Sequence, residues 1–211
     1  MPAIDHVVLE VPDTAESELF HKSAFDLGDL VQVRESHEPM SGFRGFTLSL
    51  VVSQPRTVDS LVATALEAGA REVKPVRKSF WGYGGVVQAP DGTIWKIATS
   101  SKKDSGPATR EVDDVVLLLG VADVKATKQF YVGRGMTVTK SVGSMYVEFA
   151  PGRSHPVKMA LYKRRALAKE VGVPADGTGS HRIVLGSTAD AFTDPDGFAW
   201  EAAAPPAPTP S

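Results

Sequence analysis

Four polar residues stand on otherwise apolar segments of this chain, namely His6, Lys96, Asp114 and Glu201. An imidazole and carboxylates can hold a cation through nitrogen and oxygen, and they can also transfer protons. If Asp114 and Glu201 lie close together, repulsion between their charges raises the pKa of one of them, which suits general acid–base work. We therefore expect Glu201 and Asp114 to be the catalytic residues, with two solvated carboxylates at a cavity mouth as the alternative.

An internal repeat relates these positions. Residues 89–96 (APDGTIWK) return about a hundred residues later as 194–201 (DPDGFAWE), and residues 4–9 (IDHVVL) return as 112–117 (VDDVVL). Two matched landmarks at similar spacing indicate a duplicated unit. The shared tryptophan of each copy is expected in the core, because it alternates with the polar position. The mismatched positions are His6 against Asp114 and Lys96 against Glu201.

Composition excludes several classes of function. A net charge of −2 over 211 residues argues against a nucleic-acid partner, which usually needs a basic face. No run of about twenty apolar residues is present to span a membrane. The absence of cysteine excludes disulfides, thiolate nucleophiles and cysteine-bound zinc. The first residues lack the pattern of a signal peptide, so a cytoplasmic location is expected.

Hydrophobic periodicity divides each half into two modules. The first half is predicted to contain strands at 6–11, 30–34, 46–52, 72–76, 85–88 and 93–98, with helices after Asp13 and over 58–66. The second half is predicted to contain strands at 112–119, 137–140, 145–149, 157–162, 181–185 and 198–203, with helices over 123–131 and 165–171. One module of each half is cut short, because strands are missing after residue 34 and a helix is missing before residue 193.

Segments of low periodicity set the predicted domain boundaries. The first repeat covers 1–99, a linker covers 100–110 and the second repeat covers 111–204. Residues 205–211, rich in proline and alanine, are predicted to be a disordered tail. Both a monomer and a homodimer are compatible with this organisation.

The pattern from 45 to 98 (GFTLS, AGA, VKP, FWGYGG, PDGTIW) and from 160 to 174 (ALYKR, then GVP) resembles the vicinal oxygen chelate superfamily. That superfamily comprises glyoxalase I, bleomycin-resistance proteins and extradiol dioxygenases. The resemblance implies an α+β fold in which tandem βαβββ modules, here partly truncated, form open, cup-shaped mixed β-sheets with helices packed outside. It also implies that the cup binds a ligand.

In the metal enzymes of that superfamily, side chains of the opening and closing strands hold a divalent cation in the cup. His6 and Asp114 match opening-strand positions, and Glu201 matches a closing-strand position, so these three form the candidate metal set. Lys96 stands at the other closing-strand position, where a cation repels a metal. Leucines occupy the remaining expected positions, and Glu148 and His181 are further candidates. We expect no cofactor, or else a divalent cation (magnesium, manganese, iron or zinc) in the second half.

Six residues are predicted to bind a small-molecule ligand. The aromatic residues of a glycine-rich hairpin have little core to bury them there, so they could stack on a ligand or pack against the other half. Lys96 could pair with Glu10 or capture an anion. The ligand-binding candidates are Phe80, Trp81, Tyr83, Lys96, Glu10 and Tyr162.

Three functions follow from these observations. The first is a protein that binds a small, aromatic or planar molecule in the cup and has a degenerate metal site. The alternative is a divalent-metal-dependent lyase, isomerase or dioxygenase of the glyoxalase type. A third is a non-catalytic interaction scaffold, because the missing strands reduce the cavity.

Overall fold

The computed structural model describes residues 3–80, 82–151, 157–187 and 189–202. The elements of the first half are β1 (Ile4–Val11), α1 (Thr14–Ala24), the short 3-10 helix η1 (Gly28–Leu30), β2 (Val31–Glu35), β3 (Met40–Gly42), β4 (Phe46–Val51), α2 (Pro55–Glu67), β5 (Arg71–Ser79), β6 (Gly82–Gln88) and β7 (Ile94–Thr99). Those of the second half are β8 (Asp114–Val121), α3 (Val124–Gly133), β9 (Val138–Val142), β10 (Tyr146–Phe149), β11 (Val157–Lys163), α4 (Arg164–Val171), β12 (Gly177–Gly179), β13 (Ile183–Ser187), β14 (Phe192–Thr193) and β15 (Ala199–Ala202). The predicted tail lies outside the described residues.

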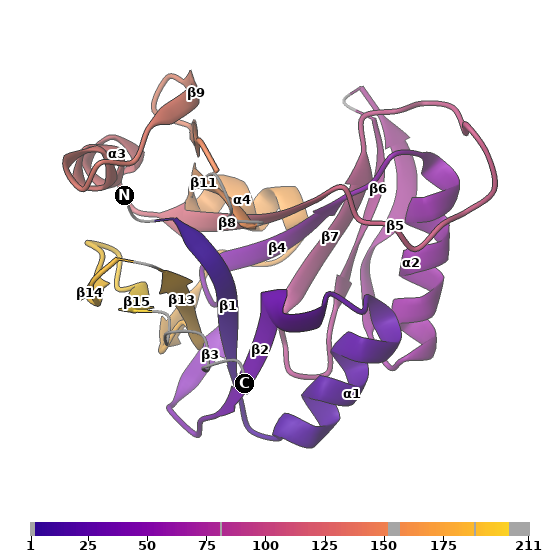
Figure 1. Ribbon diagram of the computed structural model, residues 1–211, viewed down its shortest axis with the longest axis horizontal. Coiled ribbons are helices and arrows are strands. Elements are labelled where there is room, and N and C mark those ends of the chain that lie inside the picture. Colours follow the sequence, from indigo (N-terminus) through magenta and orange to yellow (C-terminus); the bar gives the residue numbers. More distant parts are fainter. Residues whose placement is uncertain (1–2, 81, 152–156, 188, 203–211) are drawn as a thin grey trace, which may run out of the picture.

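Most strands belong to one curved mixed sheet, with the order β14-β15-β13-β1-β11-β8-β4-β7-β6-β5 (Figure 1). Strand β1 of the first repeat pairs with β13 of the second, and β4 of the first pairs with β8 of the second. The first module therefore lies beside the fourth, and the second beside the third. Each half of the sheet contains strands from both repeats.

The modules differ in completeness, as the sequence predicts. In the second and third modules the opening strand is parallel to the closing strand, as in the pairs β4–β7 and β8–β11. In the first module β2 takes this parallel place beside β1, so the module is reduced to strand, helix and strand. No helix stands between β13 and β15 within the described residues. The α+β class with a large mixed sheet is confirmed.

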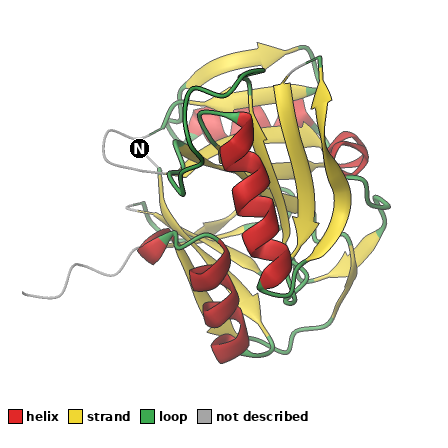
Figure 2. Cartoon of the chain, turned by 90° about the vertical axis from the view of Figure 1, so that its right-hand side faces the viewer, coloured by secondary structure: helices red, strands yellow, loops and turns green. Residues whose placement is uncertain are grey.

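The main core lies between the outer, convex side of the sheet and three helices. Figure 2 shows α1 and α2 against the strands, and α1 contacts α2. Asp13 and Asp123 cap α1 and α3. The Asp13 carboxylate accepts a hydrogen bond from Glu16 N, and the Asp123 carboxylate accepts from Lys125 N and Ala126 N. Trp95 and Trp200 are 0% and 1% exposed in this core, which confirms their predicted place.

A buried polar contact ties a helix to each copy of the repeated hairpin. His21 Nε2 of α1 lies 3.2 Å from Asp91 Oδ2, and the His21 ring contacts Trp95. Tyr131 of α3 donates its hydroxyl to Asp194 Oδ2 at 2.7 Å, and its hydroxyl also accepts from Trp200 Nε1 at 3.2 Å. An aspartate of each hairpin therefore anchors the helix of the preceding module, although Asp91 and Asp194 stand at different positions of the repeated motif.

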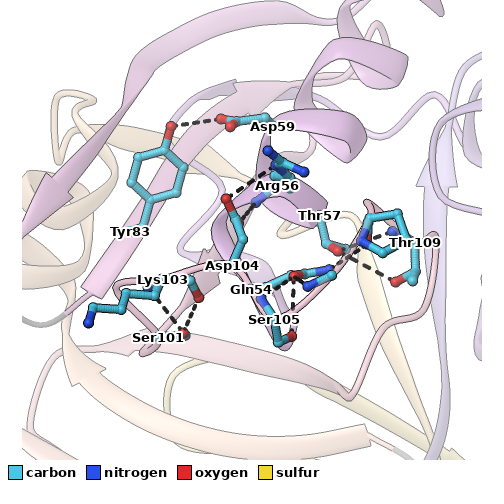
Figure 3. A network of polar contacts seen from close by, with 12 residues as sticks. Gln54, Arg56, Thr57, Asp59, Tyr83, Ser101, Lys103, Asp104, Ser105 and Thr109 are labelled. Carbon is cyan, nitrogen blue, oxygen red and sulfur yellow. Dashed lines mark hydrogen bonds and ion pairs between the residues drawn. The ribbon is translucent and has the colours of Figure 1, made fainter.

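The predicted linker is fixed to the start of α2 (Figure 3). Gln54 Oε1 accepts from the backbone N–H groups of Ser105 and Gly106, and its Nε2 donates to Pro107 O at 2.7 Å. Asp104 accepts from Arg56 N at 2.8 Å and so caps the helix that Gln54 leaves without a side-chain cap. Within the described residues, no helix is both long and apolar enough to cross a membrane.

Candidate functional site

One row of polar positions crosses the inner, concave side of the sheet where the first and fourth modules meet. His6 of β1 is paired with Gly186 of β13, and Gly186 is paired with Glu201 of β15. The three residues face away from the main core, because an adjacent residue on each strand, namely Val7, Leu185 or Trp200, belongs to that core. The topology thus brings a candidate from the first repeat near a candidate from the second.

An equivalent row crosses the concave side where the second and third modules meet. It runs through Lys96 of β7, Ser49 of β4, Val116 of β8 and Lys158 of β11. Two lysines stand at the ends of this row, and its centre holds a hydroxyl and an apolar side chain. This row therefore offers no ligand set for a divalent cation.

The two rows correct the alignment of the opening strands. His6 and Val116 stand at the same distance along the chain from the helix caps Asp13 and Asp123, so His6 corresponds to Val116 and not to Asp114. A shift of two residues leaves the side chain on the same face of a strand. The apolar pattern therefore could not reveal the error.

Asp114 is separated from Glu201 in the sheet. Strands β13, β1 and β11 lie between β15 and β8. The Asp114 carboxylate forms an ion pair with Lys158, with a distance of 2.7 Å between Oδ1 and Nζ. The structure thus assembles neither the expected catalytic pair nor the metal set of His6, Asp114 and Glu201. Among the described residues, no three side chains of His, Asp or Glu converge in a group that could hold a metal ion.

Arg34 of β2 binds the carboxylate that lies near His6. Its guanidinium donates to Glu201 Oε1 at 2.9 Å and to Oε2 at 2.7 Å, and it lies 4.0 Å from Glu10 Oε1. The hydrogen bond to Arg34 lowers the pKa of Glu201 and raises the pKa of Arg34. A cavity of about 400 Å³ opens over His6, Val8, Gln32, Arg34, Gly186 and Glu201.

Helix α4 lies across the concave side of the second and third modules. Its residues Leu167, Ala168 and Val171 are buried in a second apolar cluster that includes Leu118 of β8 and Ala160 of β11. A helix that begins directly after β11 can fold back over the sheet and bury its apolar stripe there. This helix separates two pockets on the concave side of the second and third modules.

Lys96 is bound to α4. Its ammonium lies 2.6 Å from Glu170 Oε1, and this hydrogen bond lowers the pKa of the Glu170 carboxyl. The expected pair with Glu10 is wrong, because β7 and β1 lie in different halves of the sheet. Lys74 of β5 donates to the backbone carbonyls of Lys169 and Glu170. A positive charge at the C-terminal end of α4 interacts favourably with the negative end of the helix dipole.

Tyr162 is on the same concave face, beside Tyr146. The two rings meet edge to face with centroids 4.9 Å apart, and the Tyr146 hydroxyl donates to Glu148 Oε2 at 2.9 Å. Burial is the main cause that raises the pKa of both phenols. Tyr162 therefore packs against the second apolar cluster on this face, and Glu148 is already hydrogen-bonded.

Two pockets flank α4. The smaller, about 220 Å³, is lined by Lys74, Arg77, Gly84, Lys96, Ala98 and Glu170 among others. The larger, about 390 Å³, lies under β3 and the segment that follows α4, and its apolar lining is Met40, Phe43, Phe46, Ile94, Val173 and Pro174. None of these apolar residues was among the candidates from the sequence, because their convergence depends on where α4 and β3 cross the sheet.

Phe80 and Tyr83 of the glycine-rich hairpin lie apart from the larger pocket. Phe80 is 81% exposed, and Lys102 Nζ lies 5.8 Å from its ring centroid. Tyr83 packs against the main core on the helix side, where its hydroxyl donates to Asp59 of α2 at 2.8 Å (Figure 3). Trp81 lies outside the described residues. The Tyr83 hydroxyl therefore contacts α2, while Tyr83 also contributes to the lining of the smaller pocket.

His181 and Arg164 have structural partners. The His181 ring stacks on Phe198 at 4.0 Å, and its nitrogens face the carbonyl oxygens of Arg44 and Asp196 at 2.6 and 2.9 Å. Arg164 of α4 donates to the carbonyls of Phe43 and Ala175. Neither side chain is directed at the two rows of polar positions.

Comparison with known structures identifies the architecture. Glyoxalase I from Zea mays has a TM-score of 0.63 and 13% identity, and the match covers 95% of this chain and 91% of that one. A putative dioxygenase from Bacillus subtilis has a TM-score of 0.62 and 11% identity, covering 97% and 86%. The chain has the vicinal oxygen chelate fold. At these identities the likeness shows the fold alone.

Other comparisons add little to this vicinal oxygen chelate fold. A mutant of the fosfomycin resistance protein FosX from Listeria monocytogenes, in complex with Mn(II) and dihydroxypropylphosphonic acid, matches 48% of this chain and 90% of that one, with 14% identity and a TM-score of 0.39. No family model matches the sequence, and no curated protein is significantly similar to it.

Proposed function

We propose that this protein binds a small, planar and largely apolar molecule, without a metal, in the cavity of about 390 Å³ beside α4. The lining of this cavity carries the proposal. Two aromatic rings, Phe43 and Phe46, contribute to walls completed by aliphatic side chains. Apolar walls with a few polar groups at the edge are typical of small-molecule sites.

The size of the cavity sets the size of the ligand. An engineered apolar cavity of about 150 Å³ holds benzene. The larger pocket has between two and three times that volume, so two or three fused rings would fill it. Arg71 and Asp176 lie at its edge, where a polar substituent of the ligand could meet them.

Hydrogen bonds of Arg44 hold the walls in place. Its guanidinium donates to His181 O at 3.0 Å and to Thr93 Oγ1 at 3.2 Å, and it lies 4.9 Å from the Phe46 ring centroid. Arg44 is 6% exposed, and burial lowers its pKa to about 10. Because these bonds join the segment before β13, the repeated hairpin and the segment before β4, they hold the walls of the cavity together.

A thermal-shift experiment tests this proposal with 2-naphthol, 2-naphthoic acid and anthracene-2-carboxylic acid, each with and without EDTA. A ligand at 100 times its Kd stabilises by about 2.7 kcal/mol. For a chain of this length that is roughly 5–11 °C in Tm. We expect such a shift with at least one compound, and EDTA should leave it unchanged.

Val173→Trp is the informative variant, because Val173 is half-buried at the cavity and the indole should fill it. The matched control is Val132→Trp on the exposed face of α3. The filled variant should lose the shift, and the control should keep it. A shift that survives Val173→Trp, or that requires a divalent metal, contradicts the proposed site. If no compound stabilises the protein, the scaffold alternative is favoured.

A further inference from the structure

The Glu201 carboxylate forms an ion pair with the Arg34 guanidinium of the same chain. The resemblance to the vicinal oxygen chelate superfamily implies a divalent cation between opening and closing strands, which here are β1, β13 and β15. The middle position of this row is Gly186, which has no side chain to offer. A Cβ at Gly186 would collide with the His6 ring, so the ring occupies the place of any ligand there. The residues of this row do not fit a resident metal ion.

The truncation of the first module places Arg34 at this row. Strand β2 lies parallel to β1, in the position that β7 takes beside β4, and Arg34 is paired with Glu10. Both carboxylates of this face, Glu10 and Glu201, lie within 4.0 Å of the same guanidinium. Its two-pronged bond to Glu201 uses both carboxylate oxygens, which a metal ion would otherwise need.

We propose that the Arg34 guanidinium takes the place of a divalent cation on this face, so that removing it leaves the Glu201 carboxylate, beside His6, free to bind a cation. This proposal concerns the half of the sheet that does not contain the larger pocket, and it is independent of the ligand proposed there. Without Arg34, the Glu201 carboxylate and the His6 imidazole would face one cavity of about 400 Å³ with no lysine or arginine of the described residues beside them. Carboxylate oxygens with an imidazole suit Mn²⁺.

Mn²⁺ binding to the full chain tests the assignment, with free Mn²⁺ followed by electron paramagnetic resonance. The variants are Arg34→Ala, which removes the cation, and Arg34→Lys, which keeps the charge. Arg34 and Glu201 side chains are 44% and 46% exposed, so Arg34→Ala should still fold, and circular dichroism checks this. We expect Arg34→Ala to bind one Mn²⁺ roughly tenfold or more tightly than the natural chain and Arg34→Lys.

A double variant identifies the ligands. Arg34→Ala combined with Glu201→Gln should lose the affinity that Arg34→Ala gains. Arg34→Gln gives a second way to remove the charge while a polar side chain of similar length is kept. The proposal is overturned if neither charge-removing variant binds Mn²⁺ better than the natural chain. It is also overturned if the natural chain binds one Mn²⁺ and Glu201→Gln abolishes that binding, because Arg34 would then yield to the metal.

Discussion

Replacing Tyr131 by phenylalanine removes a single hydroxyl from the core of the second half. That hydroxyl donates to Asp194 Oδ2 and accepts from Trp200 Nε1, at 2.7 and 3.2 Å. Tyr131 is 0% exposed, and Asp194 is 5% exposed. The substitution leaves no cavity larger than the lost oxygen, so its effect isolates the hydrogen bonds.

The magnitude follows from the two partners that lose their contact. A buried donor or acceptor without a partner costs about 1–3 kcal/mol. Asp194 keeps two backbone hydrogen bonds on Oδ1, from Asp196 N and Phe198 N, which limits the loss. We therefore expect Tyr131→Phe to lower the free energy of unfolding at pH 7 by about 3 kcal/mol, or roughly 6–12 °C in Tm.

The loss should depend on pH. Burial raises the pKa of Asp194, and the hydrogen bond from Tyr131 opposes that rise. Without the hydroxyl the folded-state pKa rises further. When the pKa of a carboxyl group is higher in the folded state than in the unfolded state, the group does not lower the free energy of unfolding below the unfolded-state pKa. Above the folded-state pKa it lowers that free energy by its full effect. The deficit of Tyr131→Phe should therefore be largest at neutral pH and should shrink as pH falls towards 4.

Urea denaturation at pH 7 and pH 4, followed by tryptophan fluorescence, measures both quantities. Tyr83→Phe is the matched control, because it removes a hydroxyl that bonds Asp59 near the surface. Its loss should stay below about 1 kcal/mol. Equal losses in the two variants, or a Tyr131→Phe deficit that does not change with pH, would refute the reasoning from burial.

Three further predictions follow from the contacts of other residues. All four tyrosines of the chain have a raised pKa, so absorbance at 295 nm should show little tyrosinate in the folded protein at pH 10. The free energy of unfolding should then fall as pH rises above 10, because the unfolded chain loses these protons first. Half-ionised phenols at pH 10 before unfolding would contradict this. Gly186→Ala should displace the His6 ring, which a shifted histidine resonance in NMR spectra reports, whereas Gly133→Ala, with open space at its Cβ, should leave that resonance unchanged. Asp104→Ala should cost about 1 kcal/mol and speed amide exchange at Arg56, because the first turn of α2 loses its cap, and Lys103→Ala should do neither.

Local patterns in the sequence predicted the elements well. Signals encoded within a few residues predicted the helices at Asp13 and Asp123, the strand alternation and the buried tryptophans, and the structure has each of them. The site was less accessible to the same reasoning. Arg34 reaches Glu201 across 167 positions of sequence, and α4 reaches Lys96 across 74.

Such contacts depend on which modules pair. The sequence could show that His6 and Glu201 each stand at a position where the two repeats differ, but each strand pattern is compatible with pairing inside a repeat or between repeats. The period of two also conceals a shift of two residues, which is why Asp114 took the place of Val116. A charged residue near the end of a short strand, as Arg34 is, gives no signal of its own before the partner of that strand is known.

The crossed pairing of modules has a consequence for how the chain is joined. If the backbone were cut near residue 105, each fragment would hold two modules whose sheet partners lie in the other fragment. The two pieces would have to associate to cover the edges of β1 and β4, so the intact protein is equivalent to a dimer fused into one polypeptide. Because the Gln54 side chain is hydrogen-bonded to the backbone of 105–107, the connecting segment also holds the two halves together. Co-expressed fragments should thus associate into the native fold, and replacing Gln54 should lower the affinity between them.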